Sequence, residues 1–207
     1  MTSIDPKRTA VVAVHLQNDI VGPEGAFAPF FRAEIERTGV LGVIARLLEG
    51  ARSGGASVVY TRVAWQPGYP DLHANSPLLH IVTQSKCLQD GSPGAAIVDQ
   101  TAPEDGDVVI THQRVGGFQD SDLDSTLRAA GIDTVVFVGV ATNASVEGTA
   151  RVASDLGYRT VVVSDACSAA SAAAHAASLE SLGLLAELVT ADDLLAALAG
   201  QPAETGK

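Results

Sequence analysis

The stretch VGVATNASVEGTARVASDLGYRTVVVSDAC, residues 138–167, decides the fold class. It begins with an apolar run, continues through a segment with helical spacing of its apolar residues, and reaches a second apolar run after Gly157. A short apolar run, a helix that ends at a glycine and a second apolar run are typical of a β-α-β unit with two parallel strands. The stretch therefore predicts a parallel sheet covered by helices.

The same alternation extends in both directions from this unit. Strands are predicted at Ala10–Leu16, Ser57–Val63, Val108–Thr111, Thr134–Val140, Thr160–Ser164 and Glu187–Thr190. Helices are predicted at Ile35–Ser53, Asp122–Ala130, Ser145–Leu156, Ser171–Leu182 and Ala191–Leu198. This order predicts an α/β fold with a three-layer, doubly wound, six-stranded and mostly parallel sheet, in a single domain of residues 1–207.

One edge of the predicted sheet is the place to look for chemistry, because ligands of such folds bind at the carboxyl ends of the strands. Leu16, Val63, Thr111 and Val140 are expected at that edge. Residues 64–106 leave it as a long segment with many prolines and glycines and no clear period. A segment of this kind predicts an active-site or interface loop, with a surface excursion or a contact between subunits as the alternative.

Composition narrows the class of partner and the compartment. The formal net charge is −11 with only 13 Lys and Arg, which predicts no nucleic acid and no anionic membrane as partner because both would repel the surface. The two cysteines, Cys87 and Cys167, are weak support for a disulfide framework. Residues 1–9 show no secretory leader pattern, and no run reaches the roughly 18 apolar residues of a membrane span, so a cytoplasmic protein is expected.

Three segments at the predicted edge carry a resemblance to a known family. AVVAVHLQNDI (residues 10–20) is similar to a first-strand motif that ends in Asp-x-Gln-Asn-Asp-Phe, and VVITHQRVGGF (residues 108–118) is similar to an apolar strand followed by Lys-x-Arg-x-Ser-Ala-Phe. The opening stretch resembles Gly-(Val/Ile)-Ala-Thr-x-x-Cys-Val-x-x-Thr-Ala. The chain is identified as a member of the isochorismatase-like (cysteine hydrolase) superfamily, which implies a Rossmann-like fold.

The resemblance implies a catalytic site whose three residues are all replaced. Amide-cleaving members such as nicotinamidase use an Asp after the first strand, a Lys after the third and a Cys at a helix N-terminus; the matching positions are His15, His112 and Ser145. A serine hydroxyl does not ionise there as a thiol does, so the family's thiolate mechanism is excluded. Cys87, in the long loop, and Cys167, expected beyond the fifth strand, do not replace the missing thiol.

The replacements leave three functions open. Ser145 and His15 have the residue types of a Ser–His pair, with His112 orienting His15 or binding the developing oxyanion; the nearest carboxylate in the sequence is Asp19. Acid–base chemistry without a nucleophile is the second, as in the isochorismatases proper, which hydrolyse a vinyl ether. Both predict a hydrolase or related acid–base catalyst acting on a C–N or vinyl-ether bond of a small molecule. The third is a pseudoenzyme that only binds a ligand or partner.

The resemblance also implies residues that contact substrate. It implies a cis peptide bond at Val140–Ala141, with the amides of Ala141 and Ser145 aimed at a substrate oxygen. Trp65–Pro70 resembles a pocket-wall segment of metal-free members, and Arg114 matches a family Arg that is expected to form a structural ion pair. The predicted substrate-binding residues are Ala141, Thr142, Trp65, Tyr69, Phe118 and Gln17.

No metal and no cofactor are predicted. Nicotinamidase-like members bind a metal through Asp-x-His and a further His; Asp71, His73 and His80 have a similar spacing, but in the wrong register after the second predicted strand. A metal held by His15 and His112 is equally disfavoured. The remaining partners implied by the resemblance are a small-molecule substrate and a second copy of the chain, in a homodimer or homotetramer.

Overall fold

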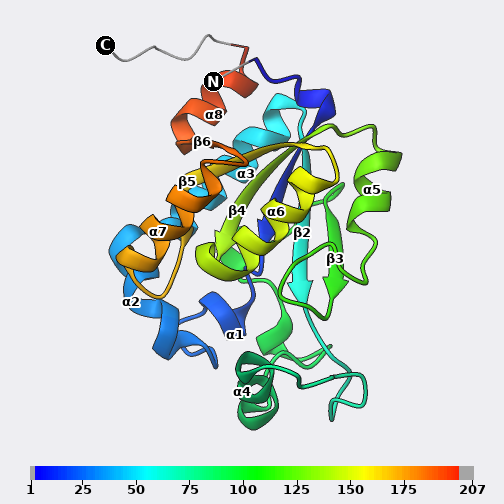
Figure 1. Ribbon diagram of the computed structural model, residues 1–207, viewed down its shortest axis with the longest axis vertical. Helices are drawn as coiled ribbons and strands as arrows, with labels where there is room; N and C mark the ends of the chain where they lie inside the picture. The colour runs from blue at the N-terminus through cyan, green and yellow to red at the C-terminus, as the bar shows by residue number, and fades with distance from the viewer. Residues whose placement is uncertain (1–2, 201–207) are drawn as a thin grey trace.

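The computed structural model describes residues 3–200, and in this part of the chain six strands form one sheet (Figure 1). The strand order is β3-β2-β1-β4-β5-β6, and each neighbouring pair is parallel. The strands are β1 (Thr9–Val14), β2 (Ser57–Val63), β3 (Val108–His112), β4 (Thr134–Val140), β5 (Arg159–Ser168) and β6 (Glu187–Val189). The predicted doubly wound α/β sheet is confirmed.

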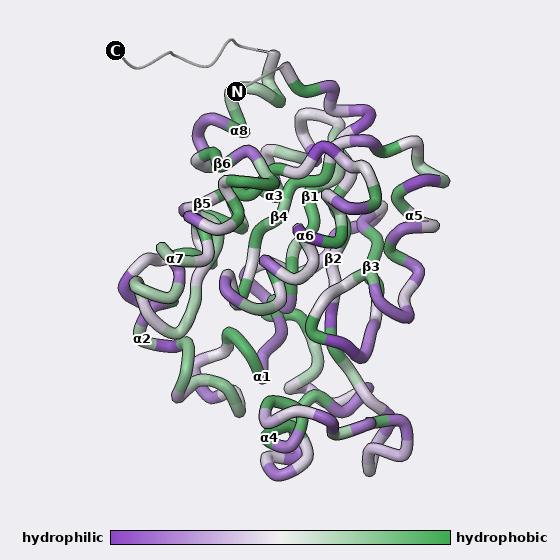
Figure 2. Tube along the Cα trace, in the orientation of Figure 1, coloured by the Kyte–Doolittle hydropathy of each residue, from purple (hydrophilic) through white to green (hydrophobic). Residues whose placement is uncertain are grey.

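Helices cover both faces of the sheet, because successive side chains of a strand point to opposite sides. Val11 and Ala13 of β1 belong to one buried core, whereas Val12 and Val14 belong to the other. The first core is covered by α2 (Ala28–Thr38), α3 (Val40–Gly54) and α8 (Ala191–Leu198). The second is covered by α5 (Leu123–Ala129), α6 (Glu147–Asp155) and α7 (Ala172–Leu182). Figure 2 shows the apolar residues gathered along the central strands.

Two of the predicted elements differ from the structure by more than two residues at one end. The helix predicted at Ile35–Ser53 is two helices, because Gly39 adopts a left-handed conformation with φ of 63° between α2 and α3. Apolar residues continue with helical spacing on both sides of this glycine, so the pattern gave no sign of the break. Strand β5 continues to Ser168, so Cys167 lies within the strand and not beyond it.

The long segment of residues 64–106 contains a helix, α4 (Pro77–Ser85), where none was predicted. The hydroxyl of Ser76 accepts a hydrogen bond from the backbone N–H of Leu79 at 3.4 Å, and Pro77 occupies the first turn, so both usual signals of a helix start are present. Figure 1 shows α4 beyond the carboxyl ends of the strands, next to the short helix α1 (Asn18–Val21). This segment therefore covers the edge at which a site was expected.

The described residues contain no helix that is both long and apolar enough to cross a membrane. The predicted single domain of residues 1–207 includes residues 1–2 and 201–207, which lie outside the described part of the chain.

Candidate active site

His15 is the first residue after β1, and two features of the backbone determine where it points. Its φ of 55° turns the chain out of the strand direction, and its N–H donates to the carbonyl of Thr61 in β2 at 2.9 Å. On the other side, a Cβ at Gly139 of β4 would lie only 2.2 Å from the carbonyl oxygen of Val14. The glycine thus allows β4 to pass close to the end of β1, directly before His15.

The side chain of His15 forms a hydrogen bond with that of His112, the last residue of β3. Their Nε2 atoms lie 2.9 Å apart, and the rings stack at 27° with centroids 5.0 Å apart. Only 4% of His15 and 2% of His112 is exposed. A hydrogen bond between two ring nitrogens needs one donor and one acceptor, so one Nε2 atom carries a proton and the other presents its lone pair.

Burial favours the neutral form of both rings. Burial away from solvent holds the pKa of His15 well below its ordinary value, and the neighbouring His112 lowers this pKa further. Burial also lowers the pKa of His112 to about 4, although the backbone of Arg114 partly opposes this shift. Both imidazoles are therefore unprotonated on one nitrogen at neutral pH, and neither is a permanent cation like the Lys that the family resemblance leads one to expect.

The second nitrogen of each ring has a different environment. Nδ1 of His112 is buried and has no hydrogen-bond partner of good geometry in the described part of the chain. Nε2 of His15 is bonded to His112, and His15, unlike His112, is among the residues that line the adjoining cavity. His15 is thus the member of the pair that a molecule bound in this cavity can contact.

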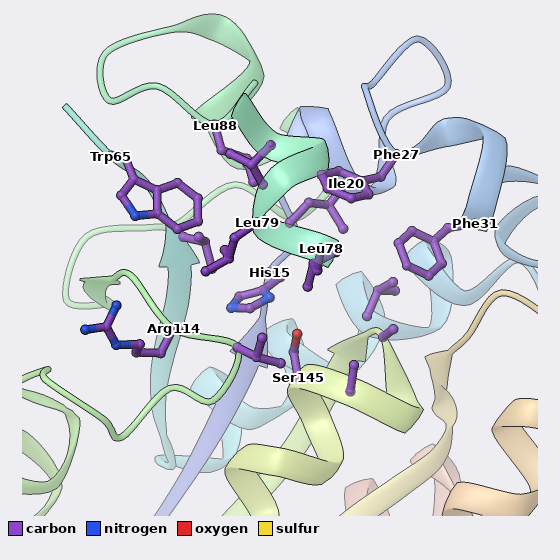
Figure 3. Close-up of a pocket in the computed structure, with 16 residues that line it drawn as sticks. His15, Ile20, Phe27, Phe31, Trp65, Leu78, Leu79, Leu88, Arg114 and Ser145 are labelled. Atoms are coloured by element: carbon purple, nitrogen blue, oxygen red, sulfur yellow. The ribbon is translucent and has the colours of Figure 1, made fainter. Parts of the chain in front are cut away.

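Ser145 lies opposite His15 in the turn between β4 and α6. This turn is one turn of π-helix, η4 (Thr142–Val146), a distortion that is frequent at functional sites. The peptide bond before it, Val140–Ala141, is cis, as the family resemblance implied. The carbonyl of Ser145 accepts a hydrogen bond from the Thr149 hydroxyl at 2.6 Å, while its own hydroxyl faces the cavity toward His15 (Figure 3).

The cavity that His15 and Ser145 share has a volume of about 100 Å³ and opens to solvent. Its walls are mostly apolar and come from the ends of the strands, from α1, from α4 and from the start of α2. Among the described residues that line it, none is a carboxylate, and the charged side chain is that of Arg114. An arrangement of a few polar groups in an apolar cleft is typical of a small-molecule site.

Of the residues predicted to bind substrate, Ala141 and Trp65 line this cavity, and Gln17 does not. The buried amide of Gln17 donates to the carbonyls of Val63 and Ala95 at 2.8 and 2.9 Å and accepts from the N–H of Val63 at 2.7 Å. These bonds join the turn between β1 and α1 to the end of β2 and to the long segment. The position of Gln17 is therefore structural.

Thr142, Tyr69 and Phe118, also predicted to bind substrate, lie outside the cavity lining. The hydroxyl of Thr142 is hydrogen-bonded to Nδ1 of His175 at 2.8 Å, and that of Tyr69 donates to a backbone carbonyl of the long segment at 2.7 Å. Phe118 stacks on Tyr158 in the second core, with ring centroids 6.2 Å apart. Each side chain thus already has a structural partner.

Arg114 lines the cavity, whereas Asp19 does not. Arg114 forms the expected ion pair, with Asp120 at 3.2 Å, and it also lines the cavity. Asp19, the nearest carboxylate in the sequence, is outside the cavity lining; its carboxylate accepts from the N–H of Leu88 at 2.7 Å and holds the long segment. His15 therefore has His112 as its partner where a Ser–His pair usually has a carboxylate.

Neither thiol lines the cavity, and neither is ionised at neutral pH as a nucleophilic thiolate would be. Cys87 and Cys167 are both buried, and burial raises the pKa of each to about 12. No group of three or more possible metal ligands occurs within residues 3–200. Asp71, at the centre of the metal motif considered above, accepts hydrogen bonds from Gln66 and Gln113 instead.

The sequence interpretation missed the aromatic and aliphatic wall of the cavity. Phe27 and Phe31 line it from the start of α2, and Leu78 and Leu79 line it from α4 (Figure 3). The signals were present in the sequence, as three phenylalanines within residues 27–31 and as a Ser-Pro helix start followed by two leucines. Phe27 and Phe31 precede the first predicted helix, and Leu78 and Leu79 lie in the predicted long loop, so neither pair belongs to a predicted element that faces the site.

Comparisons with known proteins agree with the fold and the site region. The model of the Isochorismatase domain family matches residues 9–193. Ureidoacrylate amidohydrolase of Agrobacterium fabrum is 35% identical over 179 residues, covering 79% of this chain and 77% of that protein. Its counterpart from Caulobacter segnis is 36% identical over 176 residues, covering 79% and 73%.

Solved structures give the same result at lower identity. A cysteine hydrolase from Pseudomonas syringae pv. phaseolicola superposes with a TM-score of 0.87 at 27% identity, covering 97% of this chain and 96% of that one. An N-carbamoylsarcosine amidase from Thermoplasma acidophilum superposes with a TM-score of 0.71 at 28% identity, covering 89% and 97%. The relatives named here for their activity are thus hydrolases or amidases.

Proposed function

Since this chain belongs to the isochorismatase family, we propose that it is a small-molecule hydrolase in which His15, His112 and Ser145 take the place of the family's Asp, Lys and Cys. The observation that carries the proposal is the hydrogen bond of 2.9 Å between the two buried histidine rings, next to a serine hydroxyl in the same cavity. Random substitution at three catalytic positions that no longer served a reaction would not be expected to bring two imidazole rings into a hydrogen bond.

His112 acts as a positioning residue for His15. When Nε2–H of His15 donates to Nε2 of His112, the lone pair of Nδ1 faces the cavity, and His15 is ready to accept a proton. In this arrangement the proton of His112 is on Nδ1, beside the backbone of Arg114. A carboxylate fixes the tautomer in the usual Ser–His pair, and His112 performs that task here.

The reaction then follows the general course of acyl transfer. Nδ1 of His15 takes the proton of the Ser145 hydroxyl as Oγ forms a bond to the substrate carbonyl carbon, and the same proton passes to the leaving nitrogen as the C–N bond breaks. A water molecule, deprotonated by His15, cleaves the acyl–serine ester and releases the acid. The proton returns to Ser145, so the site is unchanged after one turnover.

The electrostatics favour acyl transfer, with cleavage of a C–N or C–O bond at a carbonyl, over protonation of a vinyl ether. Proton donation to carbon requires a protonated acid at working pH, and burial holds the pKa of both His15 and His112 below the ordinary value. Few rings are protonated at neutral pH, whereas the neutral base that acyl transfer needs is the dominant form. An amide, ureido or ester carbonyl is therefore the proposed reacting group.

Labelling of the serine tests the proposal. Diisopropyl fluorophosphate should form one adduct, at Ser145, detected by peptide mass spectrometry, and 4-nitrophenyl hexanoate should be hydrolysed with multiple turnovers. Ser145→Ala should abolish both reactions, whereas Ser125→Ala, at an exposed serine of α5, should change neither. If the Ser145→Ala protein is labelled as strongly as the unmodified protein, another group is the nucleophile.

A ligand-binding protein without turnover is the second candidate. The observation that favours it is that no carboxylate is among the described residues that line the cavity, so nothing there stabilises a protonated His15. This candidate predicts that the cavity binds a ligand whether or not Ser145 is present, with no adduct and no hydrolysis. The labelling experiment distinguishes the two.

A further inference from the structure

Resting on the proposed function, we propose that the substrate carries a neutral hydrocarbon group, aliphatic or aromatic, which binds beside Phe27 and Phe31 beneath α4 while its carbonyl lies at Ser145. The substrate class is thus the amide or ester of a hydrophobic acid. This class differs from the ureidoacrylate named for the curated relatives, which carries a carboxylate.

The cavity has two unlike sides, and the reacting groups lie between them (Figure 3). On one side are Phe27 and Phe31, and on the other are Trp65 and Arg114. Leu78 and Leu79 of α4 lie between the two sides, above His15 and Ser145. A substrate whose carbonyl is at the serine can therefore extend its acyl group toward the phenylalanines.

The phenylalanine side is built from side chains that favour apolar ligands. The rings of Phe27 and Phe31 stack on each other at 28° with centroids 6.5 Å apart, so their positions depend on one another. Leu78, a large apolar residue that lines the cavity, is 40% exposed. A hydrocarbon group in this place would remove apolar surface from water on both partners, which is the main driving force for such binding.

A carboxylate would find no partner on that side. The guanidinium of Arg114 is on the opposite side of the cavity and is already paired with Asp120 at 3.2 Å. His15 and His112 are neutral, because burial lowers the pKa of both rings. Burying an anion among phenyl and leucine side chains without a counter-charge is strongly unfavourable.

Trp65 provides a reporter for binding that does not depend on turnover. It is the only tryptophan in the 207-residue sequence, and it lines the cavity. Its intrinsic fluorescence can therefore be titrated with butanamide, hexanamide and octanamide. Each added methylene should tighten the dissociation constant by about two- to fourfold, as expected when it enters an apolar site.

A matched anion tests the charge argument. The compound 6-amino-6-oxohexanoate has the chain and the amide of hexanamide but ends in a carboxylate. We expect it to bind at least about tenfold more weakly than hexanamide. Tighter binding of the anion, lost in Arg114→Gln, would show that the substrate is a carboxylate held by the arginine, and it would overturn the inference.

A variant of the cavity wall can be compared with a variant remote from it. Phe31→Ala should weaken hexanamide binding by about five- to twentyfold, since a ring that contacts the ligand is lost. Leu184→Ala, at a residue that is 87% exposed and outside the cavity lining, should change it less than about twofold. Far-UV circular dichroism checks that both variants are folded, and the chain-length series on the unmodified protein does not depend on either variant.

The two proposals can fail separately. If the neutral amides bind with the expected length dependence and none of them, nor the hexanoate ester, is turned over, the hydrolase proposal fails and the binding inference stands. If the hexanoate ester acylates Ser145 but affinity does not rise with chain length, the hydrolase proposal stands and the inference about substrate class is wrong.

Discussion

Nε2 of His15 lies 2.9 Å from Nε2 of His112, and neither ring is more than 4% exposed. The contact replaces the charged pair that an Asp and a Lys would form with two neutral groups. A neutral partner can fix the tautomer of His15, but it stabilises the protonated ring far less than a carboxylate does. In the proposed hydrolase the pair therefore corresponds to an oriented but weak base.

Removal of His15 tests its place as the base. His15→Ala should lower kcat for 4-nitrophenyl hexanoate by about two to four orders of magnitude, the usual contribution of a positioned base. His80→Ala, at a histidine of α4 outside the cavity lining, is the matched control and should leave kcat within about twofold. Full activity of the His15→Ala protein would falsify the assignment of the base.

Replacement of His112 by a carboxylate tests its place as a positioning residue. In the unmodified protein the acid limb of the pH–rate profile should lie well below pH 6.5, because burial lowers the pKa of His15 and the base form survives as pH falls. His112→Asp should move that limb to higher pH, since a carboxylate at this position favours protonated His15. If the role of His112 is only structural, His112→Asp should lower the rate and leave the acid limb of the pH–rate profile at the same pH.

The sequence predicted the placement of His15, His112 and Ser145 better than it predicted the cavity around them. All three lie at or shortly after the ends of strands, and the carboxyl ends of parallel strands lie at one edge by geometry alone, so their placement needed only the strand assignment. Gln17 illustrates what could not be predicted, because a polar residue in a site motif can bond either to substrate or to backbone. Which of the two it does depends on where residues 64–106 fold, and those contacts are long-range.

Folding stability should fall with acid between pH 6.5 and 4. The pKa of His112 is about 4 in the folded state and near 6.5 when unfolded, so the unfolded chain binds more protons in this window and becomes favoured as pH falls. This shift corresponds to about 3 kcal/mol, complete below pH 4. Urea unfolding across the window checks it. Burial also lowers the pKa of His15, which adds to the loss, so His112→Gln should reduce the pH dependence without removing it. An unchanged slope in that variant would assign the effect to other groups.

Thiol reagents should not react with the native protein. Cys87 and Cys167 are buried, and burial raises the pKa of both to about 12, so almost no thiolate is present at neutral pH. We expect iodoacetamide to leave both thiols unmodified over hours and to leave hydrolysis of the hexanoate ester unchanged. Both should react once guanidinium unfolds the chain, which is the positive control. Rapid inactivation of the native protein would indicate a reactive thiol at the site.

Gln17 should contribute to stability and not to substrate contact. Its amide makes hydrogen bonds to both backbone groups of Val63 and to the carbonyl of Ala95, and Gln17 itself is fully buried and outside the cavity lining. Gln17→Leu leaves them without partners, which should lower the free energy of unfolding by about 3 kcal/mol. Gln119→Leu, at an exposed glutamine, should change it by less than about 0.5 kcal/mol.

Because the bonds of Gln17 hold the long segment that carries Trp65 and α4, the emission of Trp65 should also shift in Gln17→Leu. A variant of normal stability that binds hexanamide poorly would instead place Gln17 among the substrate contacts.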